Sequence, residues 1–172
     1  MNIKTIYSIK IPTQHGECFI LATDKGVCWI GIPGQSLDDC LLKISRHLPE
    51  CIVDNDIKPE HLKNAADQLK HYFDGEKVQF SFALDLHGTA FQKLVWHVLQ
   101  TIPYGKICTY KDVACAINHP QAARAVGAAL GANPIAIALP CHRVIGSNKK
   151  LTGYAGGLHI KKWLLTLEGI QI

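Results

Sequence analysis

Charge is distributed unevenly along this chain, and the position at which the balance changes indicates a boundary between two domains. Residues 1–87 carry 9 Lys and Arg against 12 Asp and Glu, a net charge of −3, whereas residues 88–172 carry 9 against 2, a net charge of +7. The change falls at His87 and Gly88, so we expect two small domains, 1–87 and 88–172. An excess of positive charge in one half indicates a polyanionic partner for that half, although a solvated basic surface is an open alternative.

The first half has the pattern of an α/β domain with an antiparallel-rich sheet. Short apolar runs across residues 6–32, broken by polar residues and glycine, predict hairpins. Ser36 is placed to cap a first helix, and Pro59 and Gly75 bracket a second. Alternating apolar residues over 78–86 predict a half-buried strand. Nothing in residues 1–87 has a catalytic pattern, so we expect this domain to act as a scaffold.

The second half has the pattern of a mostly α-helical domain that contains a helix-turn-helix. Capping boxes predict helix starts at Thr89 and Thr109, and Pro120 is placed to start a further helix that runs to about Ala132. That last helix consists almost entirely of small residues around Arg124. Gly127 inside it costs about 1 kcal/mol relative to alanine. Either a DNA groove approaches this backbone closely, or a neighbouring helix packs tightly against it.

Cysteine usage and hydropathy indicate where the chain works. The seven cysteines are odd in number and form no C-x-x-C pair, the N-terminus lacks a signal-peptide pattern, and no apolar run reaches the roughly 18 residues of a membrane span. We therefore expect a cytoplasmic protein with reduced thiols and no membrane partner. The nine histidines form no metal-binding motif, so we expect no metal and no other cofactor.

One cysteine lies in a context that suits nucleophilic chemistry. Residues 135–139 are apolar and predict a buried strand or extended segment that ends at Pro140, whose fixed φ presents Cys141 at a rigid corner. The imidazole and guanidinium that follow Cys141 favour its thiolate. A buried structural cysteine fits the spacing equally well. Glu168, at the end of an amphipathic helix over 160–169, is either a solvated acid or a partner that positions an imidazole.

Residues 140–144, Pro-Cys-His-Arg-Val, resemble the active-site signature of the methylated-DNA–protein-cysteine methyltransferases. The resemblance covers residues 89–170 and is highly specific, because further family segments follow in the family's order. These segments are residues 122–127, 133–134, 153–157 and 163–169. The first half is similar only in its general pattern, and the resemblance implies a ribonuclease-H-like α/β fold there. Residues 88–172 are then the DNA-binding and alkyl-transfer domain.

The resemblance implies DNA repair by direct, irreversible, single-turnover transfer of the alkyl group from O6-alkylguanine to Cys141, with O4-alkylthymine as a further candidate substrate. Glu168 would hold His142, which would deprotonate Cys141 through a water. Lys161 would add positive charge nearby, and Asn133 would brace the segment before the nucleophile. A thiolate suits displacement at a saturated carbon, and water cannot cleave the thioether product.

The resemblance also implies how the damaged base is reached. The helix-turn-helix would dock in the minor groove, and the base would be flipped out, because a buried thiol cannot reach an O6-alkyl group inside the duplex. Arg124 would enter the base stack, and Tyr110 would contact the phosphate and help protonate the departing guanine. The expected DNA contacts are Arg124, Tyr110, Ala123 and Gly127. The expected pocket residues are Val144, Tyr154, Ala155, Gly156 and Gly157.

The partner implied is double-stranded DNA that contains O6-alkylguanine, bound by a monomer with no obligate protein partner. Three alternatives are open. A non-catalytic alkylated-base-binding protein would lack the nucleophile, so Cys141 argues against it. A cysteine hydrolase using Cys141, His142 and Glu168 would turn over repeatedly without DNA. A helix-turn-helix regulator would bind DNA whether or not Cys141 is present.

Overall fold

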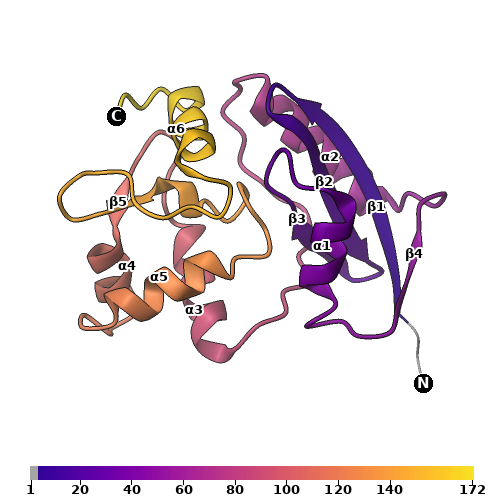
Figure 1. The fold of residues 1–172 in the computed structure, drawn as a ribbon, viewed down its shortest axis with the longest axis horizontal. Coiled ribbons are helices and arrows are strands. Elements are labelled where there is room, and N and C mark those ends of the chain that lie inside the picture. The colour runs from indigo at the N-terminus through magenta and orange to yellow at the C-terminus, as the bar shows by residue number, and fades with distance from the viewer. Residues whose placement is uncertain (1–3) are drawn as a thin grey trace. The chain divides into compact units, whose positions relative to one another are not determined.

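The computed structural model describes residues 4–172 (Figure 1). The chain divides into two compact units between His87 and Gly88, the position at which the charge balance changes. Among residues 4–172, every helix is too short or too polar to cross a membrane.

The first unit is built on a four-stranded sheet of order β3-β2-β1-β4. The strands are β1 (Lys4–Thr13), β2 (Gly16–Thr23), β3 (Gly26–Ile30) and β4 (Cys51–Asp54). Antiparallel pairing of β1 with β2 and of β2 with β3 confirms the predicted hairpins. No pattern in the sequence predicted β4, which pairs in parallel with β1. Four residues are too few to show a periodic pattern, so only long-range pairing defines this strand.

Two helices cover this sheet, α1 (Leu37–Ile44) and α2 (Glu60–Phe73), and Figure 1 shows α1 in front of it and α2 behind. The Ser36 hydroxyl accepts a bond from the amide of Asp39 at 3.1 Å, which confirms the predicted cap. Helix α2 begins directly after Pro59, and Gly75, with φ +88°, follows its end. Alternating apolar residues on both faces of the strands therefore have a helix to pack against.

The segment over 78–86 was predicted to be a strand, and this prediction was wrong. Only an isolated parallel bridge joins Leu84 to Val27, through bonds from Val27 N to Ala83 O and from Asp85 N to Val27 O, both 2.8 Å. The predicted alternation of burial holds over residues 78–83, where Phe82 is buried and Ala83 is exposed, but residues 84–86 are all half-buried. An extended chain can bury every second side chain without forming a hydrogen-bonded ladder, so the sequence pattern does not distinguish the two.

The second unit is mostly helical. Its elements are α3 (Ala90–Leu99), β5 (Cys108–Thr109), α4 (Tyr110–Ala116), α5 (Ala123–Gly131), the 3₁₀ turn η1 (Cys141–Arg143), β6 (Val144–Ile145) and α6 (Leu158–Leu167). Both predicted capping boxes are present, at Thr89 and Thr109. The indole of the buried Trp96 donates to Ala129 O at 2.8 Å, which ties α3 to α5. Helices α4 and α5 are the two members of the predicted helix-turn-helix.

Helix α5 begins three residues later than predicted. Residues 120–122 form a turn closed by the bond from Ala122 N to His119 O at 2.8 Å, so Pro120 belongs to the connection and not to the helix. The fixed φ of proline suits a turn as well as a first helical turn, and the local sequence did not distinguish them. The later start leaves Ala123 and Arg124 as the first two residues of α5.

Candidate active site

Cys141 lies where two tight turns follow one another. Pro140 has φ −79° and ψ 65°, and Cys141 N donates to Leu139 O at 2.7 Å, which closes an inverse γ-turn. The chain then enters η1, where Arg143 N donates to Pro140 O at 3.0 Å. The irregular backbone thus carries Cys141 and His142 on one turn, and Cys141 is 9% exposed.

The segment before this turn is buried, as expected, but it is neither a strand nor extended. Leu139 N donates to Ile135 O at 3.0 Å, and Ala138 N donates to Ala136 O at 2.8 Å across Ile137, which has φ +73°. A positive φ at a β-branched residue costs about 1–3 kcal/mol. The side chain of Asn133 spans the segment, because Nδ2 donates to Leu139 O at 2.8 Å and Oδ1 accepts from Ile135 N at 3.0 Å. An apolar run of five residues cannot distinguish such turns from a strand.

His142, the residue after Cys141, forms a fully buried pair with Glu168. His142 Nε2 lies 2.7 Å from Glu168 Oε1, and neither side chain has any exposed surface. Arg143 donates through Nε to Glu168 Oε2 at 2.8 Å and through Nη2 to Oε1 at 3.0 Å, and Gly105 N donates to Oε2 at 3.1 Å. Burial acts to raise the pKa of Glu168, but the bonds and charges of His142 and Arg143 outweigh it and lower the pKa to about 2. Glu168 is therefore a buried carboxylate.

Burial is the largest cause of the pKa shifts of Cys141 and His142. It raises the pKa of the Cys141 thiol against the opposing effects of the Asn133 hydrogen bond, the Lys161 charge and nearby backbone amides. It lowers the pKa of His142 against the hydrogen bond and charge of Glu168. A neutral imidazole that donates Nε2–H to Glu168 keeps its basic lone pair on Nδ1. In this state Cys141 is a thiol, and a base must remove its proton before it can react.

Lys161 is a buried ammonium that holds backbone carbonyls. It has no exposed surface, and Nζ donates to Val144 O at 2.6 Å, Thr152 O at 2.8 Å and Gly153 O at 3.5 Å. Burial lowers its pKa to about 8, and the charge of Cys141 opposes that shift. Lys161 therefore ties β6 to the loop that precedes α6.

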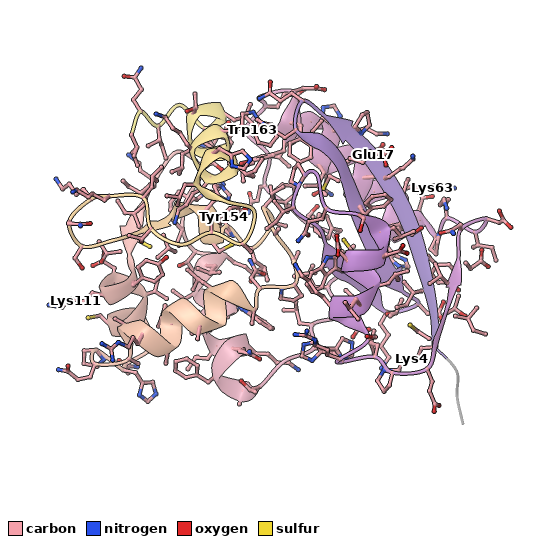
Figure 2. All side chains as sticks on the ribbon, viewed as in Figure 1. Lys4, Glu17, Lys63, Lys111, Tyr154 and Trp163 are labelled. Atoms are coloured by element: carbon pink, nitrogen blue, oxygen red, sulfur yellow. The ribbon has the colours of Figure 1, made fainter. Side chains whose placement is uncertain are left out.

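That loop carries most of the predicted pocket residues, and Figure 2 shows Tyr154 on it. Tyr154, Gly156 and Gly157 are half-buried and Ala155 is exposed. Val144 is fully buried and joins the loop through the bonds of Lys161. The hydroxyl of Tyr110 donates to Thr152 O at 3.3 Å, the carbonyl that also accepts from Lys161. Tyr110, at the start of α4, is thereby joined to the same loop.

Helix α5 presents Arg124 to solvent, and Ala123 is half-buried. Gly127 follows one turn later. A Cβ added there would meet Tyr110 Cε1 at 3.7 Å, an ordinary van der Waals contact, and a Cβ at Gly131 would meet no atom within 4 Å. The packing of this unit therefore does not require glycine at either position. The predicted DNA contacts lie on α5 and on Tyr110. Five of the six predicted catalytic residues lie on η1 or bond to residues on or next to it, whereas Tyr110 bonds to the loop at Thr152.

Sequence reasoning missed the partner of Arg143. The guanidinium was expected to favour the Cys141 thiolate, but it forms two bonds to Glu168 and a third to Ile102 O at 2.6 Å. The count of acids contained the signal. Residues 88–172 have only two, and Asp112 caps α4, so Glu168 was the acid left to pair with a buried arginine.

Together these features describe a two-domain protein in which a helix-turn-helix accompanies a cysteine turn backed by a buried His–Glu pair. Residues 90–170 match the family model of the 6-O-methylguanine DNA methyltransferase DNA-binding domain, and residues 6–86 match that of its ribonuclease-like domain. The chain is 57% identical to the methylated-DNA–protein-cysteine methyltransferase of Methanosarcina barkeri over 158 residues, which are 92% of this chain and 94% of that protein.

Further relatives cover nearly the whole chain. The inducible methylated-DNA–protein-cysteine methyltransferase of Bacillus subtilis is 39% identical over 168 residues, which are 97% of this chain and 92% of that protein. The crystal structure of the O6-methylguanine methyltransferase of Mycobacterium tuberculosis matches with a TM-score of 0.79 and 39% identity, over 95% of this chain and 92% of that one. The same mycobacterial protein in complex with DNA matches with a TM-score of 0.78.

The chain belongs to the methylated-DNA–protein-cysteine methyltransferase family. The resemblance seen in residues 140–144 is thereby confirmed, as is the predicted fold of a ribonuclease-like α/β domain followed by a DNA-binding domain. The protein is an enzyme of DNA repair that acts by alkyl transfer, and it binds DNA.

Proposed function

We propose that the protein transfers the alkyl group of O6-alkylguanine in duplex DNA irreversibly to Cys141, once per molecule. The observation that carries this proposal is the tight turn at Cys141, backed by the buried His142–Glu168 pair at 2.7 Å. The sulfur displaces guanine at the alkyl carbon, so a C–O bond breaks as an S–C bond forms. Water does not cleave the resulting thioether, and the nucleophile is not regenerated.

The proton leaves Cys141 through His142. Neutral His142 accepts it on Nδ1, through a water, while Nε2–H continues to donate to Glu168. The buried Glu168 carboxylate then stabilises the imidazolium. The charge of Lys161 favours the thiolate, and Asn133 holds the carbonyl of Leu139, two residues before the nucleophile. Tyr110 supplies the proton that the departing guanine needs to become a neutral base. Its phenolate then regains a proton from solvent, and the His142 imidazolium releases one.

The damaged base reaches Cys141 by flipping out of the duplex. Arg124, exposed at the start of α5, fills the space that the base leaves, and the small residues of α5 allow the backbone to approach the minor groove. Ala123, Gly127 and Tyr110 contact the DNA around it. The flipped base lies against Val144, Tyr154, Ala155, Gly156 and Gly157. O4-alkylthymine is a second substrate of the same site.

In this proposal the domain of residues 88–172 carries the chemistry and the DNA contacts, and residues 1–87 support it. The protein acts as a monomer in the cytoplasm, without an obligate protein partner, metal or other cofactor. The support is the location of every proposed reacting group within the second unit. In residues 4–172, no three His, Cys, Asp or Glu side chains gather in a group that could hold a metal ion.

Mass spectrometry of the intact protein tests this function. After incubation with duplex DNA that contains O6-methylguanine, one methyl group is expected on the peptide that carries Cys141, and none after incubation with undamaged duplex. C141A should bind the damaged duplex but gain no methyl group. C115A is the matched control, because Cys115 is an exposed cysteine of the same unit, and it should react like the unaltered protein. Repair of a second equivalent of DNA, or methylation at another residue, would refute the proposal.

A further inference from the structure

Arg143 has no part in the proton path described above, yet it is among the most constrained side chains of the second unit. It is 6% exposed and donates two bonds to Glu168 and one to Ile102 O. Its guanidinium also lies 5.8 Å from the ring centre of Tyr104. A buried guanidinium in a two-bond contact with a carboxylate fixes both the position and the charge of that carboxylate.

The position of Glu168 determines that of His142. Glu168 Oε1 accepts from both His142 Nε2 and Arg143 Nη2, and Oε2 accepts from Arg143 Nε and Gly105 N. Each carboxylate oxygen thus receives two donors. If Arg143 were absent, two of these four bonds would be lost, and the carboxylate would be held only by His142 and by the amide of Gly105.

The electrostatics of His142 also indicate a role for Arg143. The charged groups that act on the His142 imidazole are Glu168, Arg143 and Lys161. An isolated buried carboxylate beside an imidazole strongly favours the imidazolium. Arg143 opposes this effect of Glu168 because it lies on the same carboxylate. Burial is the main cause of the lowered His142 pKa, and the Arg143 charge acts in the same direction, so the imidazole stays neutral and can accept a proton.

We propose that Arg143 is a positioning residue for the base: it holds Glu168 in place and balances its charge, so that His142 stays neutral before the reaction and receives the proton of Cys141 only as the alkyl group is transferred. This inference rests on the proposed function of His142 as the base. Arg143 itself keeps its protons throughout. A consequence is that Cys141 remains a thiol before DNA binds, which limits its reaction with small electrophiles.

An NMR titration of the His142 imidazole tests the charge effect without any DNA. In R143M the His142 pKa is expected to rise by about 1–2 units relative to the unaltered protein, because the carboxylate is no longer balanced. R143K keeps the charge without the two-bond geometry, and its titration should stay near that of the unaltered protein. A His142 titration in folded R143M that equals the unaltered one would overturn the proposal.

The pH dependence of Cys141 reactivity is a second measurement, and it would not change if Arg143 only supported the fold. The rate of Cys141 alkylation by iodoacetamide should keep its pH dependence in R143K and shift to lower pH in R143M by the same 1–2 units as the imidazole. If R143M does not fold, E168Q and the double variant E168Q/R143M are compared, because a neutral pair is tolerated in a core. His142 should titrate about 1 unit higher in the double variant, and equal titrations would overturn the proposal.

These outcomes are separate from those of the proposed function. Methyl transfer to Cys141 from damaged duplex is measured on the unaltered protein, and its absence would refute the function whatever the titrations show. Normal methyl transfer together with unshifted titrations would leave the function intact and refute only the role of Arg143.

Discussion

Gly127 allows the two explanations of the slim helix α5 to be separated by one substitution. Within the second unit, a Cβ at this position would make an ordinary contact with the Tyr110 ring at 3.7 Å. The φ of Gly127 is not in the left-handed region, so alanine fits the backbone without strain. G127A therefore gains the helix propensity of alanine and should raise the free energy of unfolding by about 0.5–1 kcal/mol.

Binding to DNA should change in the opposite direction. If the α5 backbone approaches the groove closely, the added methyl group must displace the DNA or the helix. Overpacking of a close contact costs about 1–3 kcal/mol, which corresponds to a roughly 5- to 150-fold weaker Kd for damaged duplex. G131A is the matched control: no atom lies within 4 Å of that Cβ, so stability should rise while DNA affinity changes little.

The assay combines urea unfolding with fluorescence anisotropy on a labelled duplex that contains O6-methylguanine, at one fixed salt concentration because phosphate contacts make affinity salt-dependent. Higher stability together with weaker binding in G127A supports the DNA explanation. Lower stability with unchanged affinity would refute it, and would mean that the glycine is required by the packing of the fold.

Three further predictions concern charged residues. E168Q should lower the free energy of unfolding at pH 7 by about 3 kcal/mol, because the pKa of Glu168 in the folded protein is about 2. Measured by urea unfolding, this difference from the unaltered protein should shrink as the pH falls below 4.5 and vanish below pH 2. In the unaltered protein the free energy of unfolding should rise between pH 8 and 10.5, because the pKa of Lys161 is lowered to about 8 in the folded state. K161M should lack this rise, and equal pH profiles of K161M and the unaltered protein would refute the prediction. R124A should slow methyl transfer from duplex by about tenfold or more but not transfer from free O6-methylguanine, and equal slowing of both would exclude a role in base flipping.

The sequence predicted those parts of the fold that local chemistry determines. Side-chain caps at Ser36, Thr89 and Thr109 satisfy amides three residues ahead, so the starts of α1, α3 and α4 could be read without knowing any distant contact. Strand β4 and the turns over 135–139 depend on pairing and burial contributed by remote residues. No local sequence pattern contains these long-range contacts. For this reason β4 was not predicted, and residues 135–139 were predicted to be a strand or extended segment.

The candidate site divides in the same way. Residues 140–144 form a contiguous motif, and the nucleophile could be chosen from it. The bonds of Arg143 to Glu168 join residues 25 apart, and those of Lys161 end on backbone carbonyls, which have no signature in a sequence. The small number of acidic residues in the second half was the one sequence feature that indicated the pairing of Arg143 with Glu168.

The buried ionisable residues near Cys141 have different effects, although two of them, His142 and Arg143, directly follow it in the sequence. Glu168 and Arg143 form a buried ion pair, with Nε and Oε2 2.8 Å apart, although Arg143 is only two residues from Cys141 in the sequence. Lys161 is the buried positive charge that acts directly on the thiol. Transfer of the Cys141 proton to His142 creates one negative and one positive group within the same turn, so the net charge of the buried site does not change. In the proposed mechanism the thiolate therefore depends on His142 and on Lys161, and the Arg143 guanidinium acts on it through the carboxylate that it holds.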